Sequence, residues 1–445
     1  MQITWRGVEF KLLVPVLLLV PLGFVVTNVA LTSAFEPGPL HLALGYVALM
    51  AGAHLVLVAL GHRGDQLILP AVACMGAIGL VMLNRLPQDL AGTNALGVEL
   101  GMAATQLLWF AVGIVAMLVI AVGLREDGIL RHYKYSWAAI GILLLAATLV
   151  FGYEVNGARL WINLGPVSVQ PGELLKIVLV VFIAAYLAET RTLLTSASMR
   201  IGFLAIPPLP YFLPMLALFG LVMLIAVSLN DLGTALLFFG TFLTMLFVAT
   251  GRRSYVLIGL VLFVGGSFVA YNLFGHVQSR FDIWLDPFAD PLGAGFQPVR
   301  ALYAFGRGGL FGEGLGQGLV TLGGNLTIPY VHTDFIFTAV AEELGLLGAF
   351  ALLAVAAVLV FRGLRIAALA RDDFSALLAV GLTASLGLQT LIIIAGNTKL
   401  IPLTGITLPF VSYGGSSVVA SFVMIGLLLS ISHRSAVGSD AEPDA

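Results

Sequence analysis

The chain has 445 residues, of which 60% are hydrophobic and 10% are charged, and its formal net charge is −2. A soluble domain carries about 25% charged residues, so this composition, with a mean hydropathy of +1.05, indicates a polytopic membrane protein. The near-neutral charge gives no electrostatic basis for nucleic acid as a partner. The single cysteine, Cys74, excludes an intramolecular disulfide and a cysteine-cluster metal site, and we interpret it as a small apolar packing residue.

About 20 apolar residues are needed to span the hydrocarbon layer of a membrane. Runs of this kind predict an all-α protein with about twelve transmembrane helices. The first run follows Arg6 and Lys11 but is longer than a signal-peptide core of about 7–15 residues, so we expect a retained signal-anchor helix. The predicted spans are 11–32, 40–61, 66–84, 104–124, 135–152, 172–189, 212–229, 232–250, 254–274, 335–361, 376–396 and 411–432.

The distribution of Lys and Arg predicts that both termini are cytoplasmic, because cytoplasmic loops carry an excess of these residues. With this orientation about two thirds of the 21 Lys and Arg residues face the cytoplasm. They are Arg6, Lys11, Arg63, Arg125, Arg131, Lys134, Arg191, Arg200, Arg252, Arg253, Arg362, Arg365, Arg371 and Arg434.

The stretch 275–335 is the one long segment without a continuous apolar run, and the orientation places it outside as a large extracellular loop before the tenth helix. It mixes charges and glycines with aromatic side chains, which can bury surface and argue against disorder. Loops of this length in a compact protein are usually functional when they are ordered. The stretch ends at His332-Thr333-Asp334, between water and lipid, and we expect the chemistry there.

Ionisable residues at the membrane are costly and are functional candidates by default. Glu173 and Lys176 are three residues apart on one helix face and can pair, either for packing or for substrate. Asp231 opens a helix, where simple capping is the plainer interpretation. Glu342 and Glu343 lie roughly 12–13 Å beyond Asp334 along the same helix, and they either hold helices together or serve the site.

Asp334 has two competing interpretations. Partial burial would raise its pKa toward the range of a general base, whereas an acidic residue that opens a long helix can simply be its N-cap. His332 is a ligand, a relay or a satisfied polar residue, and the last is the plainest of the three. His332 and Asp334 do not form an H-E-x-x-H zinc motif.

Two further patterns lie in the outer segments. Arg159 can grip an anionic headgroup with its guanidinium fork, and Trp161 is either its neighbour in a site or an interfacial anchor. The glycines of GRGGLFGEGLGQG lack the Gly-Lys-Ser/Thr ending of a phosphate loop. They predict tight turns and close backbone approach instead.

Five stretches, taken in order, resemble the SEDS family (shape, elongation, division and sporulation). They cover roughly residues 104–432, and the last of them is closer to RodA-like than to FtsW-like members. The stretches are RLWINLGPVSVQPGELLK, NDLGTALL, FQPVRALYAFGRGGLFGEGLGQG, HTDFIFTAVAEELGLLG and LIPLTGITLPFVSYGGSS.

This resemblance implies a peptidoglycan glycosyltransferase that polymerises lipid-linked disaccharide-pentapeptide (lipid II) at the outer face of the bacterial cytoplasmic membrane, for cell elongation or division. The family's essential aspartate falls on Asp334. Its arginine and tryptophan fall on Arg159 and Trp161, and its glutamate and lysine on Glu173 and Lys176.

The resemblance also divides the chain. It implies a ten-helix catalytic core at 101–432, with about two extra N-terminal transmembrane helices within 1–100. The polar residues 433–445 predict a disordered cytoplasmic tail. This chain departs from the family pattern at Gly172 (usually serine), Asn230 (usually proline) and Tyr330 (often glutamate or a small residue), where acceptor or partner preference could differ.

We therefore expect an inverting glycosyl transfer with Asp334 as the base. Arg159, Lys176 or a divalent cation (Mg²⁺ or Mn²⁺) would stabilise the leaving undecaprenyl pyrophosphate; no other cofactor is expected, and the metal is left open. The implied partners are lipid II, membrane lipids and a class B penicillin-binding protein, a single-span transpeptidase. A lipid II flippase and a non-catalytic scaffold for a transpeptidase are the alternatives.

Overall fold

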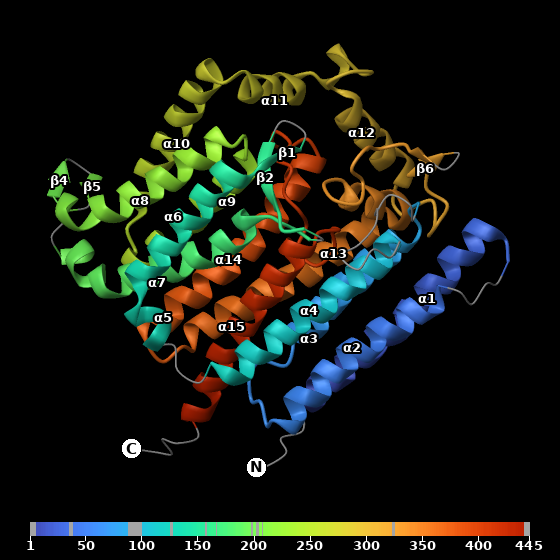
Figure 1. Ribbon diagram of the computed structural model, residues 1–445, viewed down its shortest axis with the longest axis horizontal. Coiled ribbons are helices and arrows are strands. Elements are labelled where there is room, and N and C mark those ends of the chain that lie inside the picture. Colours follow the sequence, from blue (N-terminus) through green and yellow to red (C-terminus); the bar gives the residue numbers. More distant parts are fainter. Residues whose placement is uncertain are drawn as a thin grey trace.

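The computed structural model describes residues 6–34, 39–87, 100–124, 128–155, 158–165, 167–196, 199–201, 204–206, 208–322 and 325–439. Within these residues the chain is mostly helical, and its helices run side by side in one slanted bundle (Figure 1). Twelve long apolar helices match the twelve predicted spans. They are α1 (Gly7–Thr32), α2 (Leu40–Ala59), α3 (Ile68–Asn84), α4 (Met102–Gly123), α6 (Lys134–Phe151), α7 (Pro171–Ser196), α8 (Leu209–Ser228), α9 (Leu232–Thr250), α10 (Arg253–Leu273), α13 (Ile336–Ala368), α14 (Asp373–Asn397) and α15 (Gly415–Ser439).

Eleven of these helices are long and apolar enough to cross a membrane by length and composition, and α3 is an apolar helix of 17 residues. The tail predicted to begin at 433 does not begin there, because α15 continues to Ser439. The Ser435 hydroxyl donates to the Ile431 carbonyl at 3.1 Å within this extension. Residues 440–445 lie outside the described residues.

Burial divides the long helices into a centre and a periphery. Helices α7, α14 and α15 are largely buried, and α14 packs against α7, α9 and α13. Helix α10 contributes only Tyr255 to the buried residues, and among the long helices it packs chiefly on α9. A helix with so little protein around it leaves its apolar sides, and those of its neighbours, open to lipid or to a lipid-like ligand.

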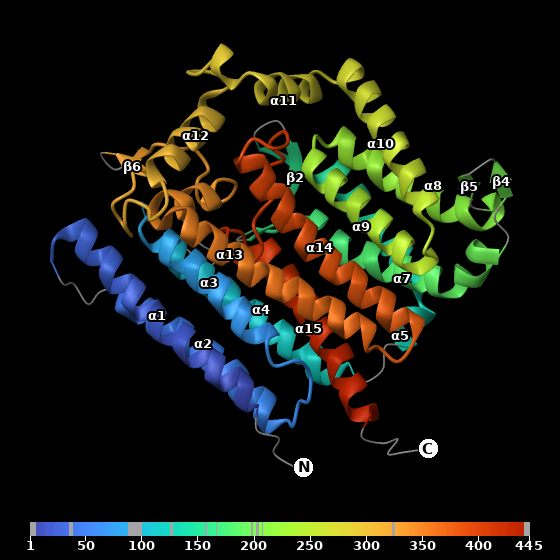
Figure 2. The same ribbon diagram turned by 180° about the vertical axis from the view of Figure 1, so that it is seen from behind.

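The predicted outer loop 275–335 is largely structured. It contains α11 (Gly275–Leu285), a 3₁₀ turn (Pro287–Ala289), α12 (Phe296–Gly308) and a hairpin of β6 (Thr321–Leu322) and β7 (Asn325–Leu326). Helix α11 crosses the upper end of the bundle, opposite the end where α1 begins and α15 ends (Figures 1 and 2). The expectation of an ordered segment is therefore confirmed, but two helices stand where a loop was predicted.

Short elements complete the described fold. Strands β1 (Tyr153–Val155), β2 (Ala158–Asn163) and β3 (Ser168–Val169) form an antiparallel sheet beside the upper end of the bundle (Figure 1). In its register Tyr153 lies opposite Trp161, and Ile162 opposite Val169. The other elements are α5 (Gly128–His132) and the hairpin of β4 (Met199–Ile201) and β5 (Leu204–Ile206).

The glycine-rich segment after α12 enters a break in α13. Gly345 has φ +67°, and the Glu342 and Glu343 carbonyls on its N-terminal side accept from the Glu313 and Gly314 amides, each at 3.0 Å. On the other side of the break, the Leu346 and Leu347 amides donate to the carbonyls of 309 and 310. A Cβ on Gly312, which has φ +82°, would meet the Glu343 carbonyl oxygen at 2.2 Å. The predicted close backbone approach of these glycines is confirmed.

The same glycine-rich segment also binds the side chains of Glu342 and Glu343, two adjacent residues of α13 that are fully buried. The Glu342 carboxylate pairs with Arg307 at 2.7 Å and accepts from the Leu319 amide at 2.7 Å. The Glu343 carboxylate pairs with Arg85, which follows α3, and accepts from the Gly316 amide at 3.0 Å. Both glutamates therefore fasten the segment after α12 to α13. Of the two interpretations given above, this agrees with the one in which they hold elements of the fold together.

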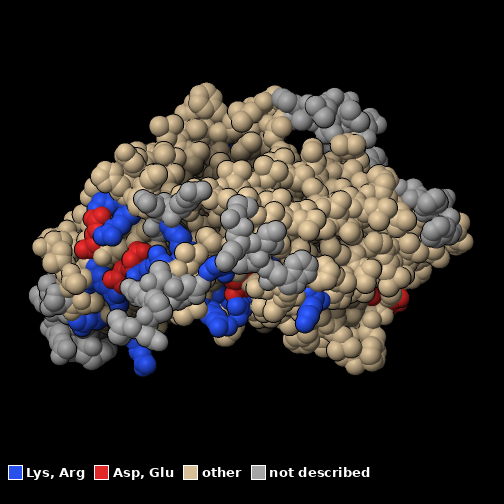
Figure 3. All heavy atoms as spheres, turned by 90° about the horizontal axis from the view of Figure 1, so that it is seen from below, with Lys and Arg blue, Asp and Glu red and all other residues tan. Residues whose placement is uncertain are grey.

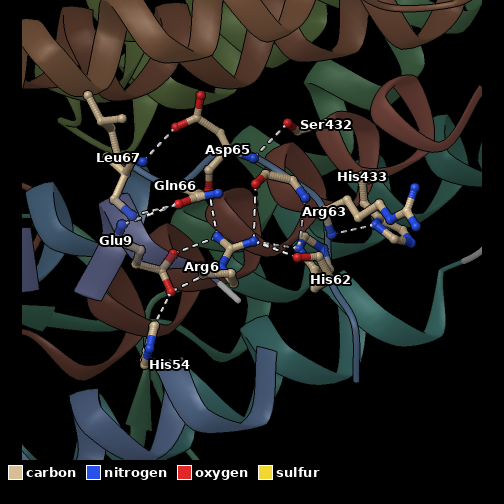
Figure 4. A network of polar contacts seen from close by, with 12 residues as sticks. Arg6, Glu9, His54, His62, Arg63, Asp65, Gln66, Leu67, Ser432 and His433 are labelled. Carbon is tan, nitrogen blue, oxygen red and sulfur yellow. Dashed lines mark hydrogen bonds and ion pairs between the residues drawn. The ribbon is translucent and has the colours of Figure 1, made fainter. Parts of the chain in front are cut away.

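A second buried ionic cluster lies at the opposite end and joins the first two helices to the core (Figure 4). The Glu9 carboxylate is 2.5 Å from the Arg6 guanidinium and 2.6 Å from Nδ1 of His54 on α2. Arg6 also donates to the carbonyls of His62 (2.8 Å) and Asp65 (2.8 Å) in the α2–α3 connection. This connection is bonded in turn to α15, because the Asp65 amide donates to the hydroxyl of residue 432.

Replacement of Glu9 by glutamine is expected to destabilise the protein strongly. The exchange leaves the buried Arg6 guanidinium without its counter-charge, and breaking a buried pair on one side costs about 3–5 kcal/mol. Thermal unfolding in detergent measures the loss. Glu313→Gln is the matched control, because Glu313 is exposed and its removal should leave the transition unchanged; equal midpoints for the two variants would contradict the prediction.

Candidate active site

Asp334 is held by its backbone, which leaves its carboxylate available for chemistry. Its amide donates to the Tyr330 carbonyl at 3.0 Å, and its carbonyl accepts from the Asn397 side chain at 3.0 Å. Helix α13 has Phe335 at its N-cap position and no side-chain capping bond. The interpretation of Asp334 as an N-cap is therefore wrong.

The neighbouring chain fixes the position of the His-Thr-Asp stretch. The Ser412 hydroxyl donates to the Thr333 carbonyl at 2.5 Å, and the Tyr413 amide donates to the His332 carbonyl at 2.8 Å. Both bonds come from the segment 398–414 between α14 and α15. Two segments that are distant in sequence thus build one wall of the site.

The surroundings of Asp334 shift the pKa of its carboxyl. Burial raises the pKa of this carboxyl to about 6, while a hydrogen bond from Thr333 and the positive charge of Arg280 act in the opposite direction. A carboxyl with this pKa is mostly ionised at neutral pH and still basic enough to accept a proton.

Arg280 is the cation of this site, and sequence reasoning missed it as a functional residue. It lies on α11, and its Nη1 donates to the Leu403 carbonyl at 2.9 Å. Burial lowers the pKa of Arg280, and the charges of Asp231 and Asp334 raise it. The sequence signal was weak, because Arg280 was one of several Arg residues on the predicted outer side.

Three cavities meet at Arg280. A cavity of about 550 Å³ and another of about 380 Å³ share Arg280, Tyr330, Asp334 and Gly405 in their walls. The third, of about 830 Å³, is an apolar groove between α8, α9 and α10 that reaches Arg280. We call them the upper cavity, the side cavity and the apolar groove.

The structure brings several predicted residues to the upper cavity, namely Trp161, Asp231, His332 and Asp334. Asp231 accepts from the Thr234 amide at 3.0 Å, so its predicted capping of α9 is confirmed. Burial of Asp231 raises its pKa. His332 differs from our preferred interpretation, because its buried Nδ1 has no hydrogen-bond partner in the described part of the chain. Burial also lowers the pKa of His332, which favours the neutral ring.

The other predicted residues lie outside the cavity walls. The Arg159 side chain is 60% exposed and lies 4.0 Å from Glu154. Lys176 is buried 2.5 Å from Glu173, as predicted, and its ammonium donates to Gln389 at 2.9 Å. Glu342 and Glu343 are fastened to the outer segment, as described above.

Among the described residues, no group of three His, Cys, Asp or Glu side chains could hold a metal ion. The charge that acts on the Asp334 carboxyl is that of a cation, Arg280. A divalent ion at this site would therefore need most of its ligands from the substrate.

The family model described as "Cell cycle protein" (FtsW, RodA, SpoVE) matches residues 65–437. Peptidoglycan glycosyltransferase RodA of Mycobacterium tuberculosis is 41% identical over 394 residues, which are 88% of this chain and 82% of that protein. Stage V sporulation protein E of Bacillus subtilis is 38% identical over 338 residues, 75% of this chain and 87% of that protein.

Solved structures agree with the sequence relatives. One solved structure is described as "Structural coordination of polymerization and crosslinking by a peptidoglycan synthase complex". A chain of it superposes on this chain with a TM-score of 0.64 at 28% identity, covering 84% of this chain and 98% of that chain. The crystal structure of RodA from Thermus thermophilus gives a TM-score of 0.55 at 28% identity, with 84% and 97% covered. The polytopic helical fold, the ordered motifs and these matches lead to one conclusion: the chain belongs to the FtsW/RodA/SpoVE (SEDS) family of peptidoglycan glycosyltransferases.

Proposed function

We propose that this peptidoglycan glycosyltransferase polymerises lipid II by an inverting transfer with Asp334 as the general base. The 4-hydroxyl of the acceptor sugar gives its proton to the Asp334 carboxylate, and its oxygen attacks the anomeric carbon of the donor. The bond from that carbon to the diphosphate oxygen breaks, and its electron pair leaves with undecaprenyl pyrophosphate. Arg280 is placed to stabilise the charge that develops on this leaving group.

The meeting of three cavities at Arg280 and Asp334 is the observation that supports this proposal. The apolar groove suits the lipid chain of the donor, because its walls are almost wholly apolar side chains of α8, α9 and α10. It shares Arg280, Ile401 and Leu403 with the side cavity, which also contains Lys399. Two cations at the end of an apolar groove suit a lipid diphosphate.

The upper cavity suits the acceptor. Among its described wall residues Arg280 is the only cation, and Trp109, Trp161 and Tyr413 supply aromatic surface. Asp334 borders both the upper and the side cavity, so one carboxylate can face an acceptor hydroxyl and the donor sugar together. In this proposal Asp231 and His332 border the acceptor, Glu173 and Lys176 support the wall from behind, and Arg159 keeps the substrate contact that the family resemblance implies.

The rate of polymerisation is expected to fall in acid. Asp334 has a pKa of about 6, and only its ionised form accepts a proton, so kcat/KM should decrease about tenfold per pH unit below that value and level off above it. Initial rates between pH 5 and pH 8 with purified lipid II give the profile. A flat profile through pH 6 would contradict Asp334 as the base.

A divalent cation, Mg²⁺ or Mn²⁺, stays part of the proposal in a limited form. Its ligands would come mainly from the donor's diphosphate, since no group of three His, Cys, Asp or Glu side chains among the described residues could hold the ion. When bound, such an ion would add positive charge near the leaving group.

The proposed setting is the cytoplasmic membrane of a bacterium, with both termini in the cytoplasm. The end of the bundle where α1 begins and α15 ends shows clusters of Lys and Arg with fewer Asp and Glu (Figure 3), as expected for a cytoplasmic face. The cavities that contain Asp334 border α11, at the opposite end, which would then face outward.

We further propose a class B penicillin-binding protein as partner, and the same assay tests the activity and this partner. Detergent-purified protein is mixed with lipid II, with and without the single-span transpeptidase, and glycan strands are resolved by gel. Strands are expected from the protein, and more of them with the partner. Lipid movement across liposomes without any strands would contradict glycosyl transfer, and equal rates with and without the transpeptidase would contradict activation by it.

A further inference from the structure

Two hydroxyl groups in the wall of the upper cavity lie side by side. Oγ1 of Thr407 lies 2.6 Å from Oγ of Ser417, and both residues belong to the cavity wall. Thr407 comes from the segment before α15, and Ser417 from the first turn of that helix. Two hydroxyls on separate elements thus form one unit, here called the hydroxyl pair.

A chain of buried polar groups holds this pair from behind. The Lys176 ammonium donates to Oε1 of Gln389 at 2.9 Å, and Nε2 of Gln389 donates to the Thr407 carbonyl at 2.8 Å and to its hydroxyl at 3.2 Å. An ammonium group can only donate, so it fixes the amide with its oxygen toward Lys176. The amide hydrogens therefore point toward Thr407.

Counting hydrogens shows what the pair offers to a ligand. The two hydroxyls carry one hydrogen each, and one of the two is used in the bond between them. Gln389 gives hydrogens to Thr407 and takes none. Neither hydroxyl has a further acceptor in the described part of the chain, so one O–H donor is left at the cavity wall.

We propose that the hydroxyl pair of Thr407 and Ser417 is a sugar-binding subsite that donates one hydrogen bond to an uncharged oxygen of the acceptor. The inference rests on the proposed function, since it names a contact for the acceptor in the upper cavity. Trp109, Trp161 and Tyr413 line the same space. Apolar aromatic surface with a few placed polar groups is the usual composition of a specific small-ligand site.

Binding of fluorescent lipid II to the Asp334→Asn protein tests the subsite without turnover. Thr407→Val or Ser417→Ala alone leaves one hydroxyl that can still donate, so each should weaken binding by less than about threefold. The double variant removes both donors and should weaken binding about tenfold, which is the upper range for one neutral hydrogen bond. Thr407→Ser keeps the hydroxyl and should bind lipid II like its parent. This variant keeps the subsite testable if the double variant does not fold.

The matched control is the double variant Thr383→Val/Ser421→Ala. Both control hydroxyls are buried, lie on α14 and α15 and have no hydrogen-bond partner in the described residues, and neither lines the cavities. This control should bind lipid II like its parent. An affinity of the Thr407/Ser417 double variant within twofold of its parent, an equal loss in the control, or a tenfold loss from Thr407→Ser would overturn the subsite.

A second substrate separates sugar from peptide as the source of the oxygen. The lipid-linked disaccharide without its pentapeptide should lose affinity for the double variant to the same extent as lipid II. A loss confined to the substrate with peptide would overturn the assignment to the sugar. Failure of the wild type to form strands would reject the proposed function, whereas strands together with unchanged binding by the double variant would reject only the subsite.

Discussion

Asp334→Asn is expected to abolish strand formation while making the folded protein more stable. The amide cannot accept the acceptor's proton, so the rate should fall by at least the factor of about 10²–10⁴ that a positioned general base contributes. Burial raises the pKa of Asp334 from 3.8 to about 6. The contribution of the Asp334 carboxyl to the free energy of unfolding is therefore fully present below pH 3.8, and it is lost as the pH rises through about 6.

Asparagine has no such loss, so the unfolding midpoint of Asp334→Asn should exceed that of wild type at pH 7 and approach it below pH 4. Gel analysis of strands and thermal unfolding in detergent provide the two readouts. Asp282→Asn is the control, because Asp282 is an exposed carboxylate of α11 outside the three cavities at Arg280. Strands from a folded Asp334→Asn protein would remove this residue from catalysis.

Arg280→Gln is expected to reduce kcat about 10²–10³-fold, the usual effect of removing one group that stabilises charge in the transition state. Arg280 borders all three cavities, and its charge lowers the pKa of Asp334. The exchange should therefore also shift the acid limb of the pH profile toward higher pH. Arg280→Lys, which keeps a positive charge, should recover part of the rate and restore the limb.

Arg300→Gln is the matched control for this experiment. Arg300 is an exposed residue of α12 whose guanidinium lies 5.1 Å from the centre of the Phe296 ring, and it lines none of the three cavities. Its rate should stay within twofold of wild type. A slow Arg280→Gln protein with an unshifted pH profile would contradict the electrostatic effect of Arg280 on Asp334, and a rate equal to that of Arg300→Gln would contradict its role at the leaving group.

The twelve long helices could be predicted from sequence because a membrane span leaves a local signal, a continuous apolar run of fixed length. The pairing of Glu173 with Lys176 and the capping by Asp231 could be predicted for the same reason, since each depends on residues within one turn. The family motifs identified Asp334 as the candidate base, and the structure adds the burial that raises the pKa of its carboxyl.

Arg280, Gln389 and the hydroxyl pair could not be predicted in this way. The contact of Arg280 with the Leu403 carbonyl joins residues 123 positions apart, and the bond from Lys176 to Gln389 spans 213. Nothing in the local sequence around any of these residues records its partner. The helices α11 and α12 were missed because their mixed polar and aromatic composition lacks the apolar run that identified the others.

The break at Gly345 has a consequence for how the protein reaches its membrane. A helix that crosses the hydrocarbon layer normally pairs all its backbone amides and carbonyls with one another, because an unpaired group there is costly. In α13, however, two carbonyls and two amides are paired by the segment 309–314. It also contains two glutamates whose partners, Arg85 and Arg307, lie outside it. All of these partners precede α13 in the chain and are synthesised before it. The helix that begins beside Asp334 therefore has all of its backbone and carboxylate partners only in the fully assembled protein, where Arg85, Arg307 and the segment 309–314 lie against it.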